Sequence, residues 1–90
     1  MDLVISKSHT SRASRDNALR CPAARAFKAA GFEHVRVDGF YMHYVDNGKY
    51  KKAELPGTLF DAIAKFDNGG EFKIGTYRIA GLKRPVKSGK

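Results

Sequence analysis

Apolar side chains recur at every second position over several short stretches of this chain, a spacing that predicts β-strands. Val, Ile, Tyr and Phe are frequent in these stretches, as is typical of strands. Gly75 interrupts the last stretch and indicates a bend there. The strands are predicted over residues 3–5, 34–37, 40–44, 49–53 and 71–79.

Two other stretches carry the three- and four-residue apolar spacing of helices. Pro22 opens the first helix, because proline suits the first helical position, and Gly31 ends it. The apolar stripe of the second helix consists of Leu59, Phe60, Ile63 and Phe66, and this helix stops before two consecutive glycines.

Two dipeptides, Asp38-Gly39 and Asn47-Gly48, predict hairpin turns of type I′, in which both central residues take a positive φ. A turn of two residues fixes the register of the strands on either side of it. The predicted opposite pairs are Val35–Met42, His34–His43, Val45–Tyr50 and His43–Lys52.

This register divides the central strands into an apolar and a polar face. The side chains expected to face the core are Val35, Val37, Phe40, Met42, Ala53 and Leu55. The side chains expected to face outward are His34, Arg36, Tyr41, His43, Val45, Tyr50, Lys52 and Glu54. A slip of one residue would mix the two sets, so their separation favours these pairings.

The elements follow one another in the order β-α-β-β-β-α-β. This order predicts an α+β fold, in which a small single domain has a mostly antiparallel sheet and two helices on one face. A chain of 90 residues is long enough for one domain with a modest core. We assign residues 1–80 to this domain and residues 81–90 to a basic, flexible tail.

Charge adds a functional expectation to this fold. The chain carries a formal net charge of +8, concentrated in residues 7–28, 49–52 and 83–90. Concentrated positive charge attracts polyanions such as nucleic acid, and it also attracts acidic protein surfaces. The alternative interpretation is that the charge serves solubility alone.

Cysteine content and hydropathy bear on the compartment. The single cysteine, Cys21, cannot form a disulfide within one chain, which favours a reducing compartment. No apolar run approaches the roughly 18 residues of a membrane-spanning helix. We therefore expect a cytoplasmic protein with no membrane partner.

The polar face of the predicted sheet holds the first candidate binding site. Tyr41 and Tyr50 lie near Arg36 and Lys52 on this face. Bases of single-stranded nucleic acid stack on aromatic rings of this kind while cations contact the phosphates. The alternative is an ordinary solvent face, because these residue types are common on antiparallel sheets.

A polar segment at residues 6–20 holds the second candidate site. It lacks helical periodicity and is predicted to be a loop with at most one helical turn. Its arginines, Arg12, Arg15 and Arg20, are suited to contact phosphate oxygens. The alternative is a mobile loop that binds nothing.

Signals for catalysis or metal binding are incomplete. The pair His34 and His43 would supply two of the three or four ligands that zinc needs, and nothing in the sequence completes the set. Cys21 precedes a helix, which lowers a thiol pKa, but no histidine is placed to act as its base. We predict no metal, no cofactor, no small-molecule substrate and no enzymatic activity. A small enzyme that uses Cys21 or the histidine pair is the alternative.

Several residues resemble a pattern found in short uncharacterised proteins of phages and prophages. The matching residues are Ile5, His9, Cys21-Pro22, Val35, Val37, Leu55-Pro56 and Phe66-Asp67. The basic loop, the basic tail and the long second hairpin depart from that pattern. The resemblance implies a viral setting in a bacterial host cell and a non-enzymatic accessory role, and it transfers no functional residue.

Together these observations predict a non-enzymatic basic binding module that contacts nucleic acid, a nucleoprotein or an acidic surface. In a phage setting such a module would inhibit a host defence complex, in the manner of anti-CRISPR proteins. Inhibitors that imitate DNA are acidic, so this basic chain would instead contact nucleic acid or an acidic groove. The alternative is a module that binds only protein, through an acidic partner.

Overall fold

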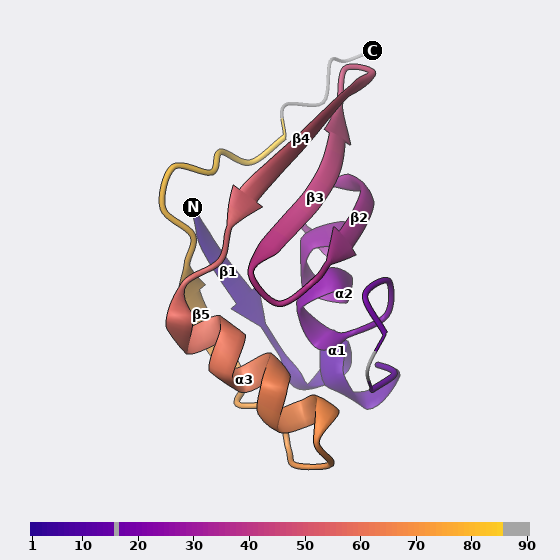
Figure 1. The fold of residues 1–90 in the computed structure, drawn as a ribbon, viewed down its shortest axis with the longest axis vertical. Helices are drawn as coiled ribbons and strands as arrows, with labels where there is room; N and C mark the ends of the chain where they lie inside the picture. The colour runs from indigo at the N-terminus through magenta and orange to yellow at the C-terminus, as the bar shows by residue number, and fades with distance from the viewer. Residues whose placement is uncertain (16, 86–90) are drawn as a thin grey trace.

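The computed structural model describes residues 1–15 and 17–85, and it has the α+β fold that the sequence predicts (Figure 1). The elements are β1 (Asp2–Ile5), α1 (Lys7–Ser11), α2 (Pro22–Ala29), β2 (Glu33–Val37), β3 (Tyr41–Asp46), β4 (Lys49–Glu54), α3 (Gly57–Asp67) and β5 (Gly75–Arg78). The predicted order is confirmed, with one short helix added within the loop that was expected at 6–20. None of these helices is long and apolar enough to cross a membrane.

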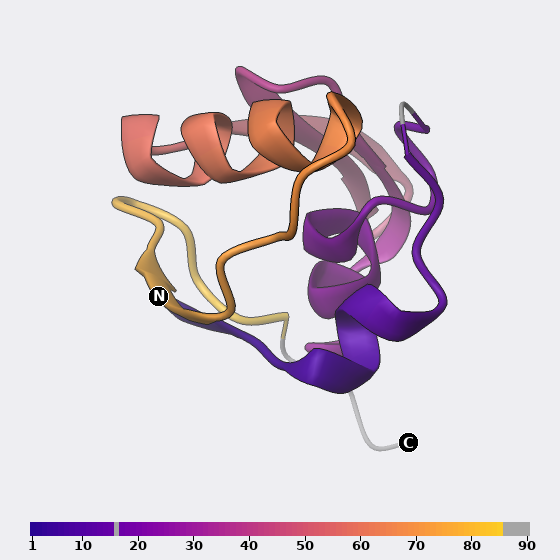
Figure 2. The same cartoon turned by 90° about the horizontal axis from the view of Figure 1, so that it is seen from below.

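The strands form two antiparallel sheets rather than the one that the sequence predicts. In the first sheet β1 pairs with β5, and in the second the strand order is β2-β3-β4. Helix α2 packs against both β1 and β2 and lies near the middle of the molecule (Figure 2). A sheet must bury its apolar face against another element, and α2 serves both sheets in this way.

The core forms around α2. Cys21 caps this helix, because its Sγ accepts a hydrogen bond from the amide of Ala24 at 3.4 Å. The small alanines on the buried side of α2 let the strands approach closely. The largest fully buried side chains come from both sheets and both long helices and include Leu3, Ile5, Phe27, Met42, Leu59 and Ile79. Each contributes roughly 1.5–3 kcal/mol by burial.

The second hairpin confirms the predicted turn and register. Asn47 and Gly48 both take positive φ, at 53° and 76°, as a type I′ turn requires. Val45 lies opposite Tyr50, and His43 lies opposite Lys52. The dipeptide therefore determines the alignment of β3 with β4.

The register of the first hairpin differs from the prediction by two residues. Val37 rather than Val35 lies opposite Met42, and the turn is formed by Gly39 and Phe40. Oδ1 of Asp38 accepts the amide hydrogens of Phe40 (3.1 Å) and Tyr41 (2.8 Å), which places Asp38 before the turn instead of within it. Gly39 takes a φ of 100° at the first central position, where type II′ turns have a positive φ.

The shift of two residues separates the two histidines that the sequence placed opposite each other, and His34 itself lies in a bulge of β2. Arg36 pairs with His43 and Glu33 pairs with Val45, so β2 has one extra residue between these pairs. His34 lies in this bulge with a φ of 54°. The predicted His34–His43 pair is therefore wrong, because Arg36 occupies the position opposite His43.

The predicted faces are largely confirmed, because a shift of two residues leaves each side chain on the same side of the sheet. Val35, Val37, Met42 and Leu55 are buried as expected. Phe40 is the exception: it is 64% exposed because it lies in the turn. Its ring stacks on Phe60 of α3, with centroids 4.8 Å apart.

The loop before α2 and the segment after β5 both contact the body of the domain. The amide of Val37 donates to the carbonyl oxygen of Ala18 at 2.9 Å, so the loop before α2 lies along the edge of β2. The amino group of Met1 donates to the carbonyl oxygens of Ile79 and Leu82, and Leu82 is buried. The packed chain thus extends past residue 80, while residues 86–90 of the expected tail lie outside the described residues.

Candidate functional site

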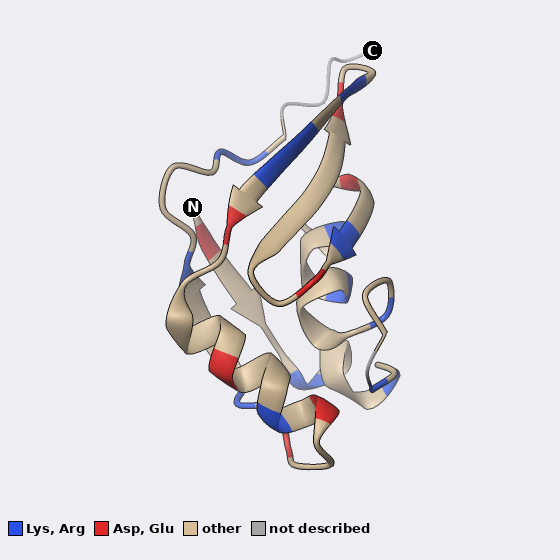
Figure 3. Cartoon of the chain, viewed as in Figure 1, with Lys and Arg blue, Asp and Glu red and all other residues tan. Residues whose placement is uncertain are grey.

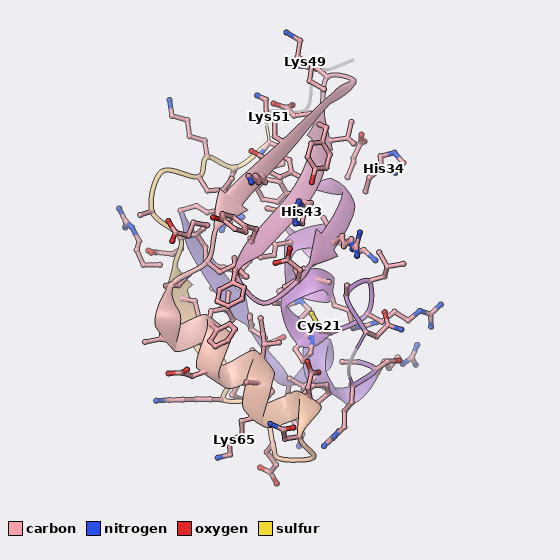
Figure 4. The ribbon with its side chains drawn as sticks, viewed as in Figure 1. Cys21, His34, His43, Lys49, Lys51 and Lys65 are labelled. Atoms are coloured by element: carbon pink, nitrogen blue, oxygen red, sulfur yellow. The ribbon has the colours of Figure 1, made fainter. Side chains whose placement is uncertain are left out.

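One side of the β2-β3-β4 sheet presents aromatic and charged side chains to solvent. We call this surface the outer face. It consists of Arg36, Asp38, Tyr41, His43, Tyr50, Lys52 and Glu54. Tyr41 is 37% exposed and Tyr50 is 67% exposed. Figure 4 shows His43 on β3, with α2 behind the sheet and Cys21 lower in the view, at the start of α2.

The strand register arranges the outer face in rows. Arg36, His43 and Lys52 lie side by side across β2, β3 and β4. In the next row Tyr41 lies opposite Glu54. Nζ of Lys52 reaches diagonally over the ring of Tyr41, 4.5 Å from its centroid. The cation and the ring are therefore held together as a unit.

His43 connects two other residues of this face. Its Nε2 lies 2.8 Å from Oδ2 of Asp38, and its Nδ1 is hydrogen-bonded to the hydroxyl of Tyr50. The Asp38 carboxylate can only accept, so Nε2 donates to it, and in a neutral ring Nδ1 is then the acceptor for the Tyr50 hydroxyl. The rings of His43 and Tyr50 are nearly parallel, 24° apart, with centroids separated by 5.7 Å. The position of Tyr50 on the face is thus fixed by a chain of hydrogen bonds.

The Asp38 carboxylate is held in its charged form by the same contacts. Partial burial acts to raise the pKa of Asp38, but the hydrogen bonds from His43 and from the amides of Tyr41 and Phe40 outweigh it. The net result is a pKa below the ordinary value for aspartate. A charged Asp38 strengthens its hold on His43, because a hydrogen bond to a carboxylate is stronger than one to a neutral acid.

Charge on the outer face is nearly balanced. Arg36 and Lys52 are offset by Asp38 and Glu54. Figure 3 shows that Lys and Arg are also found on the loop and helices beside β2, at the tip of the β3–β4 hairpin and after β5. The net charge of +8 therefore surrounds the outer face more than it lies on it.

The three loop arginines predicted to bind phosphate differ in their surroundings. Arg15 donates to the carbonyl oxygens of Gly69 and Gly70, and its guanidinium lies 4.4 Å from the centroid of the Phe66 ring. These contacts attach the loop to the end of α3. Arg12 and Arg20 are exposed. The structure thus brings Arg36, Tyr41, Tyr50 and Lys52 together on one surface and keeps Arg12, Arg15 and Arg20 on a separate loop.

The residues considered for catalysis or metal binding are not brought together. Cys21 is only 2% exposed, and burial raises the pKa of its thiol despite the opposing effect of hydrogen bonds from the amides of Ala24 and Ala23. A raised pKa is the opposite of what an activated nucleophile needs. Within residues 1–15 and 17–85, no three His, Cys, Asp or Glu side chains cluster as a metal site would require.

Sequence reasoning missed the role of Asp38 and assigned His43 to the wrong partner. Both errors come from the turn: the sequence was interpreted as placing Asp38 within it. An aspartate before a glycine can also accept amide hydrogens of the residues that follow it, which is the signal for the observed arrangement.

No family model, curated protein or solved structure matches this chain.

Proposed function

We propose that this protein is a non-enzymatic module that binds single-stranded nucleic acid through its outer face. The supporting observation is the arrangement of Tyr41, His43 and Tyr50 as neighbouring rings on an open antiparallel sheet, next to Lys52 and Arg36. Unpaired bases stack on such rings, and the neighbouring cations contact the phosphates that connect the bases.

The shape of the surface favours single strands over duplexes. Rings on a sheet face stack only on bases whose own faces are free, and the bases of a duplex are already stacked on one another. Tyr50 is more accessible than Tyr41, because a larger fraction of its side chain is exposed. One side of the Tyr50 ring lies against His43, and the other side is open to a base. A base that stacks on Tyr41 displaces Lys52, which then reaches a phosphate.

The surrounding cations steer the strand to this face. Arg36 and Lys52 would contact phosphates directly, and exposed Arg12 and Arg20 add to the long-range attraction. Arg15 serves to anchor the loop. In the phage setting that the resemblance implies, the target would be a bound strand or nucleoprotein of a host defence complex, and inhibition would follow from that contact.

Fluorescence anisotropy with labelled single-stranded RNA, single-stranded DNA and duplex DNA tests this function, at about 50 and about 200 mM salt. We expect single strands to bind more tightly than duplex, and Tyr41→Ala to weaken binding by roughly 5- to 150-fold, which corresponds to ~1–3 kcal/mol per stacked base. Tyr41→Phe keeps the ring and should retain most of the affinity.

Charge variants provide a matched control. Lys52→Gln and Lys65→Gln each remove one positive charge, but Lys65 lies on α3, away from the outer face (Figure 4). Lys52→Gln should weaken binding more than Lys65→Gln. Equal effects, together with no effect of Tyr41→Ala, would assign any binding to overall charge. No binding to any of the three nucleic acids would reject the proposal and favour a module that binds only protein.

A further inference from the structure

Strand β4 has a free edge. It is the outer strand of its sheet, and no strand pairs with its other side within residues 1–15 and 17–85 (Figure 1). The amide of Leu55, just after β4, donates toward β3, to the carbonyl oxygen of Phe40 at 2.8 Å. Since the direction of the amides alternates along a strand, those of Tyr50, Lys52 and Glu54 point away from β3. Such a row of free amides and carbonyls is a template for an added strand.

Cations flank this edge. Lys49 and Lys51 project from β4 on the side opposite the outer face, and Lys51 also contacts Asp46 at 3.1 Å. Beside them a groove of about 760 Å³ lies between the β3–β4 hairpin and the segment that follows β5. Its lining includes Lys51, Lys83 and Arg84. The acidic side chains in this lining are Glu33 and Asp46.

We propose that an acidic peptide in extended conformation adds to the edge of β4 as a fourth strand. The peptide backbone would bond to the free amides and carbonyls of Tyr50, Lys52 and Glu54, which is the mode of β-strand addition. On one side of the sheet, its alternate side chains would meet Lys49 and Lys51, with Lys83 and Arg84 across the groove. Acidic residues at every second position therefore match this surface.

Charge complementarity favours an acidic peptide over a second copy of the chain and over residues 86–90 as the occupant of this edge. A second copy of the chain would bring its own Lys49, Lys51 and Lys52 against the same edge, and like charges repel across paired strands. Residues 86–90 carry Lys87 and Lys90 and no acid, so they do not complement the edge either. Nucleic acid lacks the repeating amides and carbonyls that would satisfy a free strand edge. An acidic peptide meets both the backbone and the charge requirement.

The test uses a labelled peptide of about eight residues, with Glu at every second position and Val or Thr between. A peptide with Lys in place of each Glu is the control. Anisotropy measures affinity, and amide hydrogen exchange by NMR measures protection of individual residues. We expect the Glu peptide to bind, the Lys peptide to fail, and the amides of Tyr50, Lys52 and Glu54 to exchange more slowly in the complex.

Substitutions at Glu54 and at the two lysines separate the backbone contribution from charge. Glu54→Pro removes one outward amide and leaves the hydrogen bonds to β3, since proline is tolerated where an edge amide faces solvent. Glu54→Gln removes the same charge but keeps the amide, so Glu54→Pro should bind the peptide roughly two- to tenfold more weakly than Glu54→Gln, the value of one hydrogen bond. Lys49→Gln with Lys51→Gln should also weaken binding, which provides a second test if Glu54→Pro fails to fold.

Several results would overturn the proposal. They are equal binding of the Glu and Lys peptides, no binding of the Glu peptide, and binding that leaves the three outward amides unprotected. Tyr41→Ala should not affect peptide binding, because Tyr41 lies on β3 and not at this edge. The peptide site and the nucleic-acid site can therefore fail independently.

Discussion

The hydroxyl of Tyr50 is hydrogen-bonded to Nδ1 of His43, although the two residues lie diagonally across neighbouring strands. The opposite nitrogen of His43 contacts Asp38, so three side chains, from the residue that follows β2, from β3 and from β4, form one hydrogen-bonded chain. Such a chain reduces the freedom of the exposed Tyr50 ring before any ligand arrives. A ring ordered in advance loses less conformational entropy on stacking, which favours affinity.

Replacing His43 should therefore weaken binding without abolishing the fold. We expect His43→Ala to reduce single-strand affinity by about two- to tenfold, because Tyr50 loses its hydrogen bond and the ring beside it. The same variant should raise the pKa of Asp38 toward its ordinary value, which NMR titration of the carboxyl group measures. His34→Asn is the control, since His34 lies in the bulge of β2 and asparagine tolerates its positive φ. Unchanged affinity in His43→Ala would contradict this role.

Acid should remove the stabilisation that Asp38 provides. The pKa of Asp38 is lower in the folded than in the unfolded chain, so protonation favours unfolding. Its contribution is fully present above the unfolded pKa, near 3.8, and is lost as pH falls through the lower folded pKa. Thermal unfolding of the native chain and of Asp38→Asn should differ at neutral pH and converge in acid. A difference that grows as pH falls would have the wrong sign.

Two of the loop arginines, Arg15 and Arg12, should differ in their contribution to the free energy of unfolding. Arg15→Ala should cost about 1 kcal/mol of unfolding free energy, since it removes hydrogen bonds to Gly69 and Gly70 and a contact with Phe66, all at the surface. Arg12→Ala should leave stability within about 0.5 kcal/mol of the native value. Urea unfolding measures both. If Arg12→Ala proves the more destabilising, the anchoring role assigned to Arg15 is wrong.

The two hairpin turns should tolerate an added methyl group differently. Gly39 and Gly48 both have positive φ, so alanine is strained at either position. At Gly39 the new Cβ would also lie 3.3 Å from Cε1 of Phe60, whereas nothing lies within 4 Å at Gly48. We expect Gly48→Ala to cost about 1–2 kcal/mol and Gly39→Ala about 2–3 kcal/mol. Urea midpoints in the reverse order would contradict the placement of the first turn.

The sequence predicts the element types and faces of this fold well for a physical reason. Side-chain direction alternates with a period of two, so the error of two residues in the first hairpin left Val35, Val37 and Met42 on the core side. Asn47-Gly48 has few alternatives to a type I′ turn, and the second register was therefore correct.

Other features depend on contacts that a sequence pattern does not encode. The amide hydrogens that Asp38 accepts place the first turn at Gly39 and Phe40. The resulting shift of two residues brings Arg36, rather than His34, opposite His43. The division into two sheets depends on β1 pairing with β5, whose residues lie far apart in the chain. Of the candidate site, the four residues chosen on the sheet do share one surface, but the chain from Asp38 through His43 to Tyr50 required the actual register.

The most direct test of the central claim is an NMR titration of the isotope-labelled protein with a single-stranded oligonucleotide of about ten nucleotides. If the outer face binds the strand, the largest shifts should fall on Arg36, Tyr41, His43, Tyr50 and Lys52, and they should disappear in Tyr41→Ala. Shifts confined to the loop around Arg12 and Arg20 or to the segment at Lys83 and Arg84, or no shifts at all, would contradict the claim.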